Sequence, residues 1–268
     1  MQDAQPEPIR QEEETDWKQQ EQEWSSWWGD AVNKWSVTVY PRIRHFLPAH
    51  TILELAPGHG RWSHFLKDLC SKLYLVDVTP HCIERCRQRF LGANHIEYHV
   101  NDGFSLEMIP SRSIDLFFSF DSLMLADVNV IRSYVSQLDR VLANQGTALI
   151  HHSNAKVYRR YFHTLDLLPA EVTRSLQRHG LIQNRGMRSI DVSGDDVLKM
   201  CHSFNLDVLL QERIPWGGTF LIDCITVVRR QQARFACRMP KIISNREFMR
   251  EAAIGKSVLD SYQGARSA

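Results

Sequence analysis

The stretch TILELAPGHGR, residues 51–61, decides the fold. Its first five residues are mostly apolar, which predicts a short buried strand, and Pro57 and Gly58 end that strand in a turn. Gly58 and Gly60 let the backbone turn tightly and let a ligand approach without a Cβ in the way. Helical spacing follows from Trp62 to Leu69, so the free N–H groups of a helix start face the same place.

Strands and helices continue to alternate along the chain. Further strands are predicted at 73–76, 96–100, 114–120 and 147–151, with helices at 80–90 and 128–142. Repeated strand–helix–strand units imply a parallel sheet covered by helices on both faces, a Rossmann-like α/β fold. Later, Asp191–Phe204 has the pattern of a helix with Ser193 as its N-cap, and two more strands, 206–212 and 220–228, follow it.

Four ranges describe the predicted organisation. Residues 1–14, rich in Gln, Glu and Pro, read as a disordered lead. Residues 15–48 are an N-terminal helical region, in which the helix is expected to end before Pro41. This region either docks on the core or acts as a lid. Its aromatic face consists of Trp17, Trp24, Trp27, Trp28 and Trp35. The main domain is 49–230, with a helical insert at 154–190, and 231–268 is a C-terminal extension.

Composition excludes several classes of protein. The 268 residues carry a net charge near +1, which favours neither nucleic acid nor a charged membrane surface. The six cysteines form no CxxC pair, and Cys82 and Cys86 read as small core residues rather than zinc ligands. No apolar run reaches the length of a membrane span, and the polar N-terminus does not resemble a signal peptide. We expect a cytoplasmic protein, with a homo-oligomer left open.

Acidic side chains follow the predicted strands at their carboxyl ends, where open parallel sheets bind ligands. Asp77 can accept hydrogen bonds from both hydroxyls of a ribose and would repel a 2′-phosphate. Asp102 can accept one from an adenine amino group, and Phe104 can stack nearby. Asp121, after the fourth strand, is expected beside the reaction centre. These groups, found at the ends of successive strands, together predict a nucleoside-containing cofactor.

The segment from Glu54 to Trp62 resembles the first motif of class I S-adenosylmethionine-dependent methyltransferases, and Val76-Asp77 and Asn101-Asp102-Gly103 resemble the second and third. The resemblance covers roughly 50–152 and 190–229. It implies seven strands, the last two an antiparallel hairpin, and S-adenosyl-L-methionine as cofactor. It implies that backbone near Ala56 and Gly58 holds the cofactor's amino-acid part, with Glu54 just below. The other cofactor contacts we expect are Pro57, Gly60, Trp62, Asp77, Val78, Asn101, Asp102, Gly103, Phe104 and Phe120.

A narrower resemblance, to small-molecule methyltransferases of glycan-modifying systems, is suggested by Gly58–Trp62, Ser119–Leu123, His151–Asn154 and Trp216–Cys224. It implies a small polar acceptor, such as a sugar hydroxyl. A hydroxyl must lose a proton, so a base is needed. His151 and His152 end the fifth strand and point to opposite sides. We expect His152 to be the base, oriented by Asp121, or both histidines to be ordinary polar residues.

Other functions stay open at this stage. Asp121, His152 and Asp223 could hold a divalent ion, although their spacing does not require one, and we predict no metal. The same cofactor site would serve methylation of nitrogen, phosphate or a natural-product scaffold. A binding protein that has lost its chemistry is another reading, and protein methylation is not excluded. The segment Ser119–Ser122 lacks the Asn-Pro-Pro-Tyr pattern of nucleic-acid methyltransferases.

Overall fold

The computed structural model describes residues 30–231 and 239–266. Contacts within the chain define two compact units. Of the described residues, unit 1 comprises 30–119, 140–148 and 250–266, and unit 2 comprises 120–139, 149–231 and 239–249. The predicted lead at 1–14 lies outside the described residues, as do Trp17, Trp24, Trp27 and Trp28. The domain boundaries drawn from the sequence stay a prediction.

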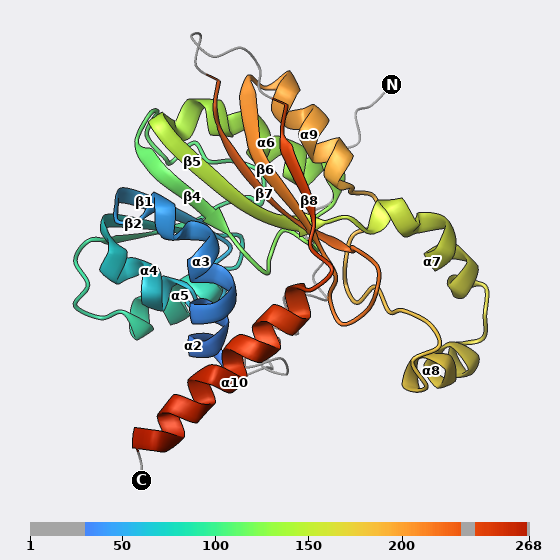
Figure 1. Ribbon diagram of the computed structural model, residues 1–268. Helices are drawn as coiled ribbons and strands as arrows, with labels where there is room; N and C mark the ends of the chain where they lie inside the picture. The colour runs from blue at the N-terminus through green and yellow to red at the C-terminus, as the bar shows by residue number, and fades with distance from the viewer. Residues whose placement is uncertain (1–29, 232–238, 267–268) are drawn as a thin grey trace. The chain divides into compact units, whose positions relative to one another are not determined.

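A parallel sheet forms the centre of unit 1 (Figure 1). Its strands are β1 (Ala49–Leu55), β2 (Cys70–Asp77), β3 (Ile96–Val100) and β4 (Ile114–Ser119). Parallel pairing gives the order β3-β2-β1-β4. The apolar side chains of the central strands are buried on both faces, which is why those strands read as continuous apolar runs: Ile52, Leu53, Leu73, Leu75, Phe117 and Phe118. The first four predicted strands are confirmed.

The helical run that precedes β1 passes through Pro41. It consists of α2 (Ala31–Lys34), a π-helical turn (Trp35–Val39), α3 (Tyr40–Ile43) and a 3-10 turn (Arg44–Phe46). The Tyr40 N–H donates to the Trp35 carbonyl, one residue further back than in an α-helix. This shift comes directly before Pro41, which has no N–H of its own to place. The prediction that the helix ends before Pro41 is therefore wrong.

Three further helices belong to unit 1. They are α4 (Ser63–Leu66), which continues as a 3-10 turn (Lys67–Leu69), α5 (Pro80–Arg89) and most of α10 (Phe248–Arg266). Helix α10 lies beside the run that precedes β1 (Figure 1), with an ion pair of 3.8 Å between Arg42 and Glu251. Gly255 packs so closely on Val37 that a Cβ would have no room there. Helix α10 belongs to the C-terminal extension drawn from the sequence.

Unit 2 contains an antiparallel hairpin of β6 (Leu206–Ile214) and β7 (Asp223–Arg230), as predicted. An eighth strand, β8 (Lys241–Ser244), pairs in parallel with β6 and was missed. It is short and mostly exposed, so it lacks the apolar run that marks a buried strand. Hydrogen bonding gives the sheet the order β3-β2-β1-β4-β5-β7-β6-β8, in which β5 (Leu142–Ser153) supplies residues to both units.

The helices of unit 2 include the predicted insert. They are α6 (Val128–Val141), nearly all of it in this unit, a 3-10 turn (Ala155–Tyr158), α7 (Arg159–Asp166), α8 (Ala170–Arg178) and α9 (Gly194–Ser203). Ser193 caps α9 in a capping box with Asp196, as its position predicted. Among the described residues, no helix combines the length and the apolar character that crossing a membrane requires.

Candidate functional site

The loop after β1 carries three residues in the left-handed region. Ala56 has φ 55°, Gly58 has φ 56° and Gly60 has φ 79°. Glycine takes this conformation freely, whereas alanine does so at a cost, so the surroundings must hold it there. The Ala56 N–H donates to the Val76 carbonyl at 2.7 Å, which extends the pairing of β1 with β2 into the loop. A strained residue held in place at a strand end is a common feature of ligand sites.

Asp77 joins this loop to the one after β2. Its Oδ2 accepts from the Gly58 N–H at 3.2 Å, and its Oδ1 accepts from the Thr79 N–H at 2.8 Å. Burial raises the pKa of Asp77 to about 6, while these two N–H groups favour the ionised form. Each carboxylate oxygen accepts more than one hydrogen bond, so both retain capacity for ribose hydroxyls. The structure thus adds a loop-bridging role to the one expected from the sequence.

Helix α5 supports the same loop from its other side. The Cys86 thiol donates to the Gly58 carbonyl at 3.3 Å, and Arg89 donates to the His59 carbonyl at 2.9 Å. A Cβ at Gly60 would lie 2.7 Å from the ring of Phe90. Gly60 is therefore required by packing as well as by its backbone angle, and sequence reasoning missed this part of the site.

Glu54 is buried in β1 and tied to the start of α4. Its Oε2 accepts from the Ser63 hydroxyl at 2.5 Å, and the residue is 2% exposed. Burial raises the pKa of Glu54 to about 8, so the carboxyl group is mostly neutral at pH 7. A neutral Glu54 can hold the strand and helix that flank the loop without placing a charge in the core.

Glu54→Gln should remove a pH dependence of stability. The folded-state pKa of Glu54 lies above its unfolded value, so wild-type stability falls as the pH rises from about 4.5 through 8. The neutral amide keeps an acceptor for Ser63 and has no charge to bury. The free energy of unfolding of Glu54→Gln should therefore exceed that of wild type by about 2 kcal/mol or more at pH 9. Urea unfolding between pH 5 and 9 measures this. Glu97→Gln is the control, because the pKa of exposed Glu97 is lowered below that window by Lys72. Parallel pH profiles for wild type and Glu54→Gln would contradict the assignment.

The loop after β3 is closed by its own hydrogen bonds. Asp102 Oδ1 accepts from the N–H groups of Phe104 and Ser105 at 2.8 and 2.6 Å, and these bonds lower the pKa of Asp102. Asn101 accepts from Gly103 at 3.2 Å and donates to Ser105 at 2.9 Å. Asp102 is exposed. Its Oδ2 takes no part in these turn bonds and is the oxygen that could accept from an adenine amino group.

The remaining cofactor residues drawn from the sequence lie in different surroundings. Trp62 is 2% exposed, and the ring centroids of Trp62 and Trp35 are 6.4 Å apart. The Arg61 guanidinium lies 4.4 Å from the Trp62 ring centroid. Trp35 stacks on Phe65 at 4.7 Å, so the one predicted tryptophan of the helical region that is described docks on the core of unit 1. Pro57 is buried and Val78 is half-buried beside the loops. Phe120 belongs to unit 2.

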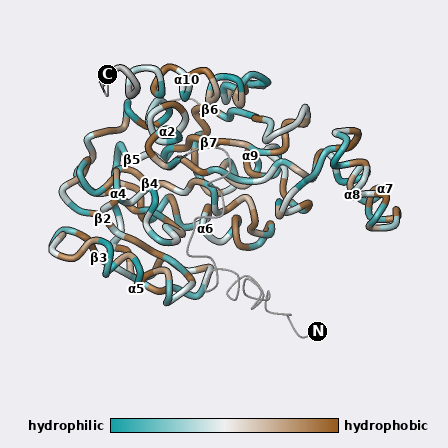
Figure 2. Tube along the Cα trace, turned by 90° about the horizontal axis from the view of Figure 1, so that it is seen from below, coloured by the Kyte–Doolittle hydropathy of each residue, from teal (hydrophilic) through white to brown (hydrophobic). Residues whose placement is uncertain are grey.

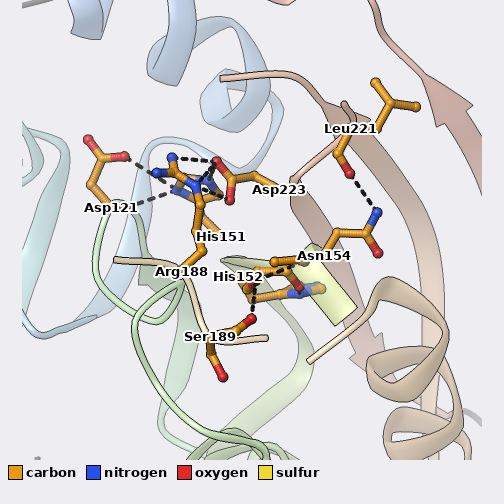
Figure 3. Close-up of polar contacts among 10 residues, drawn as sticks. Asp121, His151, His152, Asn154, Arg188, Ser189, Leu221 and Asp223 are labelled. Carbon is orange, nitrogen blue, oxygen red and sulfur yellow. Dashed lines mark hydrogen bonds and ion pairs between the residues drawn. The ribbon is translucent and has the colours of Figure 1, made fainter. Parts of the chain in front are cut away.

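Unit 2 contains a buried chain of four ionisable side chains, Arg188, Asp223, His151 and Asp121 (Figure 3). Arg188 donates to both oxygens of Asp223, with distances from 2.8 to 3.1 Å. Nε2 of His151 lies 3.6 Å from Asp223 Oδ2, and its Nδ1 lies 3.4 Å from Asp121 Oδ1. Phe120 and Trp216 cover the imidazole, with centroids at 4.6 and 5.8 Å.

Two kinds of contact bear on the charge of His151. Carboxylates lie on both sides of the ring, and the Asp121 backbone N–H donates to Nδ1 at 3.1 Å. Burial alone would lower its pKa, but the carboxylates of Asp121 and Asp223 outweigh burial and raise the pKa to about 9. With His151 protonated, two cations balance two carboxylates, which is how buried charges are tolerated. Asp121 has φ 64°, a second strained residue at a strand end.

His152 points to the other side of β5, as the alternation of a strand requires. Its Nδ1 donates to the Ser153 carbonyl at 2.9 Å, so its Nε2 accepts from the Thr226 hydroxyl at 2.8 Å. Burial lowers the pKa of His152 to about 4. The structure pairs Asp121 with His151, so the pair expected from the sequence, His152 with Asp121, is not the one that forms.

Arg188 is the main residue of this chain that sequence reasoning missed. It lies at the end of the insert, 35 residues before Asp223, in a segment without periodicity. No local pattern pairs an arginine with an aspartate at that distance. Arg188 also donates to both oxygens of Asp223, the carboxylate that the metal alternative needed as a ligand. Among residues 30–231 and 239–266, no three His, Cys, Asp or Glu side chains are arranged to hold a metal ion.

Residues 52–146 match the family model described as a methyltransferase domain. Nodulation protein S of Sinorhizobium fredii (strain NBRC 101917 / NGR234) is 31% identical over 119 residues, which are 43% of this chain and 53% of that protein. Nodulation protein S of Rhizobium fredii is 30% identical over 128 residues, 46% of this chain and 67% of that protein. This chain thus spans about half of the first relative and two thirds of the second.

Two solved structures share the fold. A S-adenosylmethionine-dependent methyltransferase from Clostridium acetobutylicum ATCC 824 has a TM-score of 0.54 and 13% identity, covering 76% of this chain and 93% of that one. N-methyltransferase NodS from Bradyrhizobium japonicum WM9 has a TM-score of 0.50 and 15% identity, covering 75% and 98%. With the family model, the Rhizobium fredii relative and the loop geometry, these findings show that the chain belongs to the S-adenosylmethionine-dependent methyltransferases.

Proposed function

We propose that this protein transfers the methyl group of S-adenosylmethionine to the nitrogen of a small polar acceptor of the amino-sugar class. The observation that carries the cofactor half of the proposal is Asp77. Its carboxylate bridges the loops after β1 and β2 through Gly58 and Thr79 and keeps capacity for a ribose.

The residues of unit 1 fit the cofactor's chemical groups. Asp77 would hold the ribose hydroxyls, Asp102 Oδ2 the adenine amino group, and the backbone around Ala56 and Gly58 the amino-acid part. When bound, S-adenosylmethionine supplies a methyl group on a sulfonium, which is ready for displacement by a nucleophile. The protein's own task is then to align the acceptor with that carbon, since proximity accounts for much of the barrier reduction in such a step.

The two histidines favour nitrogen over oxygen as the acceptor atom. A sugar hydroxyl has to give up a proton as it attacks, and a general base works best when its pKa is near the operating pH. His152 has both ring nitrogens occupied and a pKa of about 4. His151 lies between two carboxylates, accepts from the Asp121 N–H at Nδ1 and has a pKa of about 9. A neutral amine carries its own lone pair and attacks without a base.

The comparisons supply independent support. One structure of the same fold is described as an N-methyltransferase, and both curated relatives carry the name nodulation protein S. The sugar class rests on the narrower resemblance to glycan-modifying methyltransferases noted in the sequence. Methylation of a sugar hydroxyl, the expectation from sequence alone, is the alternative that the experiment must separate.

Three acceptors that differ at one position make this separation. Purified protein is incubated with methyl-labelled S-adenosylmethionine and glucosamine, N-acetylglucosamine or glucose. The proposal predicts label only on glucosamine. Acetylation delocalises the nitrogen lone pair into the amide and leaves the other hydroxyls intact, and glucose has a hydroxyl in place of the amine. Equal labelling of all three would establish O-methylation. If none is labelled while cofactor binding is measurable, the amino-sugar class is wrong.

A further inference from the structure

Helix α8 is held at the tip of the insert without burying any of its own side chains. In Figure 1, α7 and α8 extend outward from the strands of unit 2. Helix α7 is anchored, because Phe162 is 3% exposed and packs in an aromatic cluster with Tyr161 and Phe220. The return segment is anchored through Gln183, which accepts from the Phe220 N–H at 2.9 Å. The two anchors present α8 to solvent.

Helix α8 is amphipathic. Val172 and Leu176 are four residues apart in α8, so they share one face of the helix. Leu167 is 85% exposed and Leu181 is 70% exposed, in the segments before and after α8. Figure 2 shows hydrophobic and hydrophilic positions alternating along α7 and α8. Exposed apolar side chains gathered at one tip mark a site of interaction.

The same segment is basic in a chain that is almost neutral. Between residues 154 and 190 stand seven Lys or Arg residues and two acidic ones, a net charge of +5, whereas the whole chain carries +1. Lys156, Arg159 and Arg188 pair with carboxylates outside these residues, Asp196, Asp191 and Asp223, which leaves +2 on the insert. Arg174 and Arg178 lie on the face of α8 opposite Val172 and are exposed. The partner must therefore be anionic as well as apolar.

We propose that α8 and its flanking leucines dock on the surface of an anionic phospholipid bilayer. An amphipathic helix with apolar side chains on one face and arginines on the other lies in the plane of the headgroups, where acyl chains cover the first face and phosphates attract the second. Nucleic acid offers phosphates without an apolar layer, so it would leave Leu167 and Leu181 uncovered. This inference concerns the insert alone and stands apart from the identity of the methyl acceptor.

Vesicle sedimentation of the full chain tests the proposal. The protein should bind vesicles of phosphatidylcholine with about one-third phosphatidylglycerol, and bind pure phosphatidylcholine at least tenfold more weakly. The double variant Arg174→Glu/Arg178→Glu should lose the anionic preference, and Val172→Ser/Leu181→Ser should weaken binding at least tenfold. These positions are exposed, so the fold should survive both changes, and circular dichroism checks this.

Matched controls lie in unit 1. Leu91 is 84% exposed and Arg87 is exposed on α5, so Leu91→Ser and Arg87→Glu make the same chemical changes away from the insert. They should bind vesicles like wild type. Absence of binding to anionic vesicles would overturn the proposal, and so would binding that the insert variants leave unchanged. Binding to a DNA duplex or to an acidic protein without binding to vesicles would overturn it as well. Cofactor affinity, measured in parallel, reports separately on the proposed function.

Discussion

Replacing Asp77 with alanine should weaken S-adenosylmethionine binding at least tenfold. The substitution removes the acceptor proposed for the ribose hydroxyls, and a charge-assisted hydrogen bond contributes about 1.5–3 kcal/mol. It also releases the N–H groups of Gly58 and Thr79, so the loops lose their common anchor. Titration calorimetry measures the affinity, and thermal unfolding without cofactor measures the cost to the fold.

The pH dependence separates the two roles of Asp77. Burial raises its pKa to about 6, so the carboxylate is ionised above that pH and protonated below it. Ribose hydroxyls donate best to the ionised form, so wild-type affinity should rise as the pH rises through 6 and then level off. Asp77→Asn keeps one acceptor and the side-chain shape, and its affinity should be flat. Exposed Asp68, replaced by Ala, is the control within unit 1. Unchanged affinity in Asp77→Ala would mean that the ribose is held elsewhere.

Arg188→Met should destabilise the protein by about 3–5 kcal/mol, the cost of removing one partner from a buried ion pair. The bidentate pair with Asp223 is buried, and the side chain of Asp223 is 0% exposed. Without the guanidinium, Asp223 keeps only His151 as a cation, and the chain Asp223–His151–Asp121 carries a net negative charge in the core. Chemical denaturation gives the free energy of unfolding.

A surface ion pair provides the comparison for Arg188. Arg159 lies 3.6 Å from Asp191 with both side chains about half exposed, so Arg159→Met should cost about 0–1 kcal/mol. Arg188→Lys keeps the charge and loses the bidentate geometry, so its loss should be intermediate. Wild-type stability should also fall as the pH rises from 6.5 through 9, because the raised pKa of His151 favours the folded state only while the imidazole is protonated. Similar losses for Arg188→Met and Arg159→Met would show that the buried chain contributes little.

The core of the fold was predictable because its signals are local and strong. Strands β1, β2 and β4 are largely buried runs such as Ile114–Ser119, and Pro80 and Ser193 mark helix starts by their own chemistry. Strand β8 was not predictable, because an exposed four-residue strand takes its conformation from its pairing with β6 rather than from its own pattern. The helix does not end before Pro41, because a π-helical turn at Trp35–Val39 comes directly before it and the chain continues as α3.

The candidate site divides in the same way. Gly58, Asp77 and Asp102 stand at strand ends, so topology alone brings them to one edge of the sheet in unit 1. The supports of the loop do not follow from topology: Cys86, Arg89 and Phe90 reach it from α5 by side-chain contacts that no spacing rule predicts. For the histidines, alternation along β5 predicted that only one could join Asp121. Which one depended on the positions of Asp223 and Thr226, on a strand whose register with β5 the sequence does not reveal.

The most direct test of the account is calorimetric titration of the wild-type protein with S-adenosylmethionine. The loop after β1, bridged to the loop after β2 by Asp77, predicts saturable binding at one site for each chain, with affinity that rises through pH 6. A folded protein that takes up no heat-detectable cofactor at any pH between 5 and 8 would contradict the central claim.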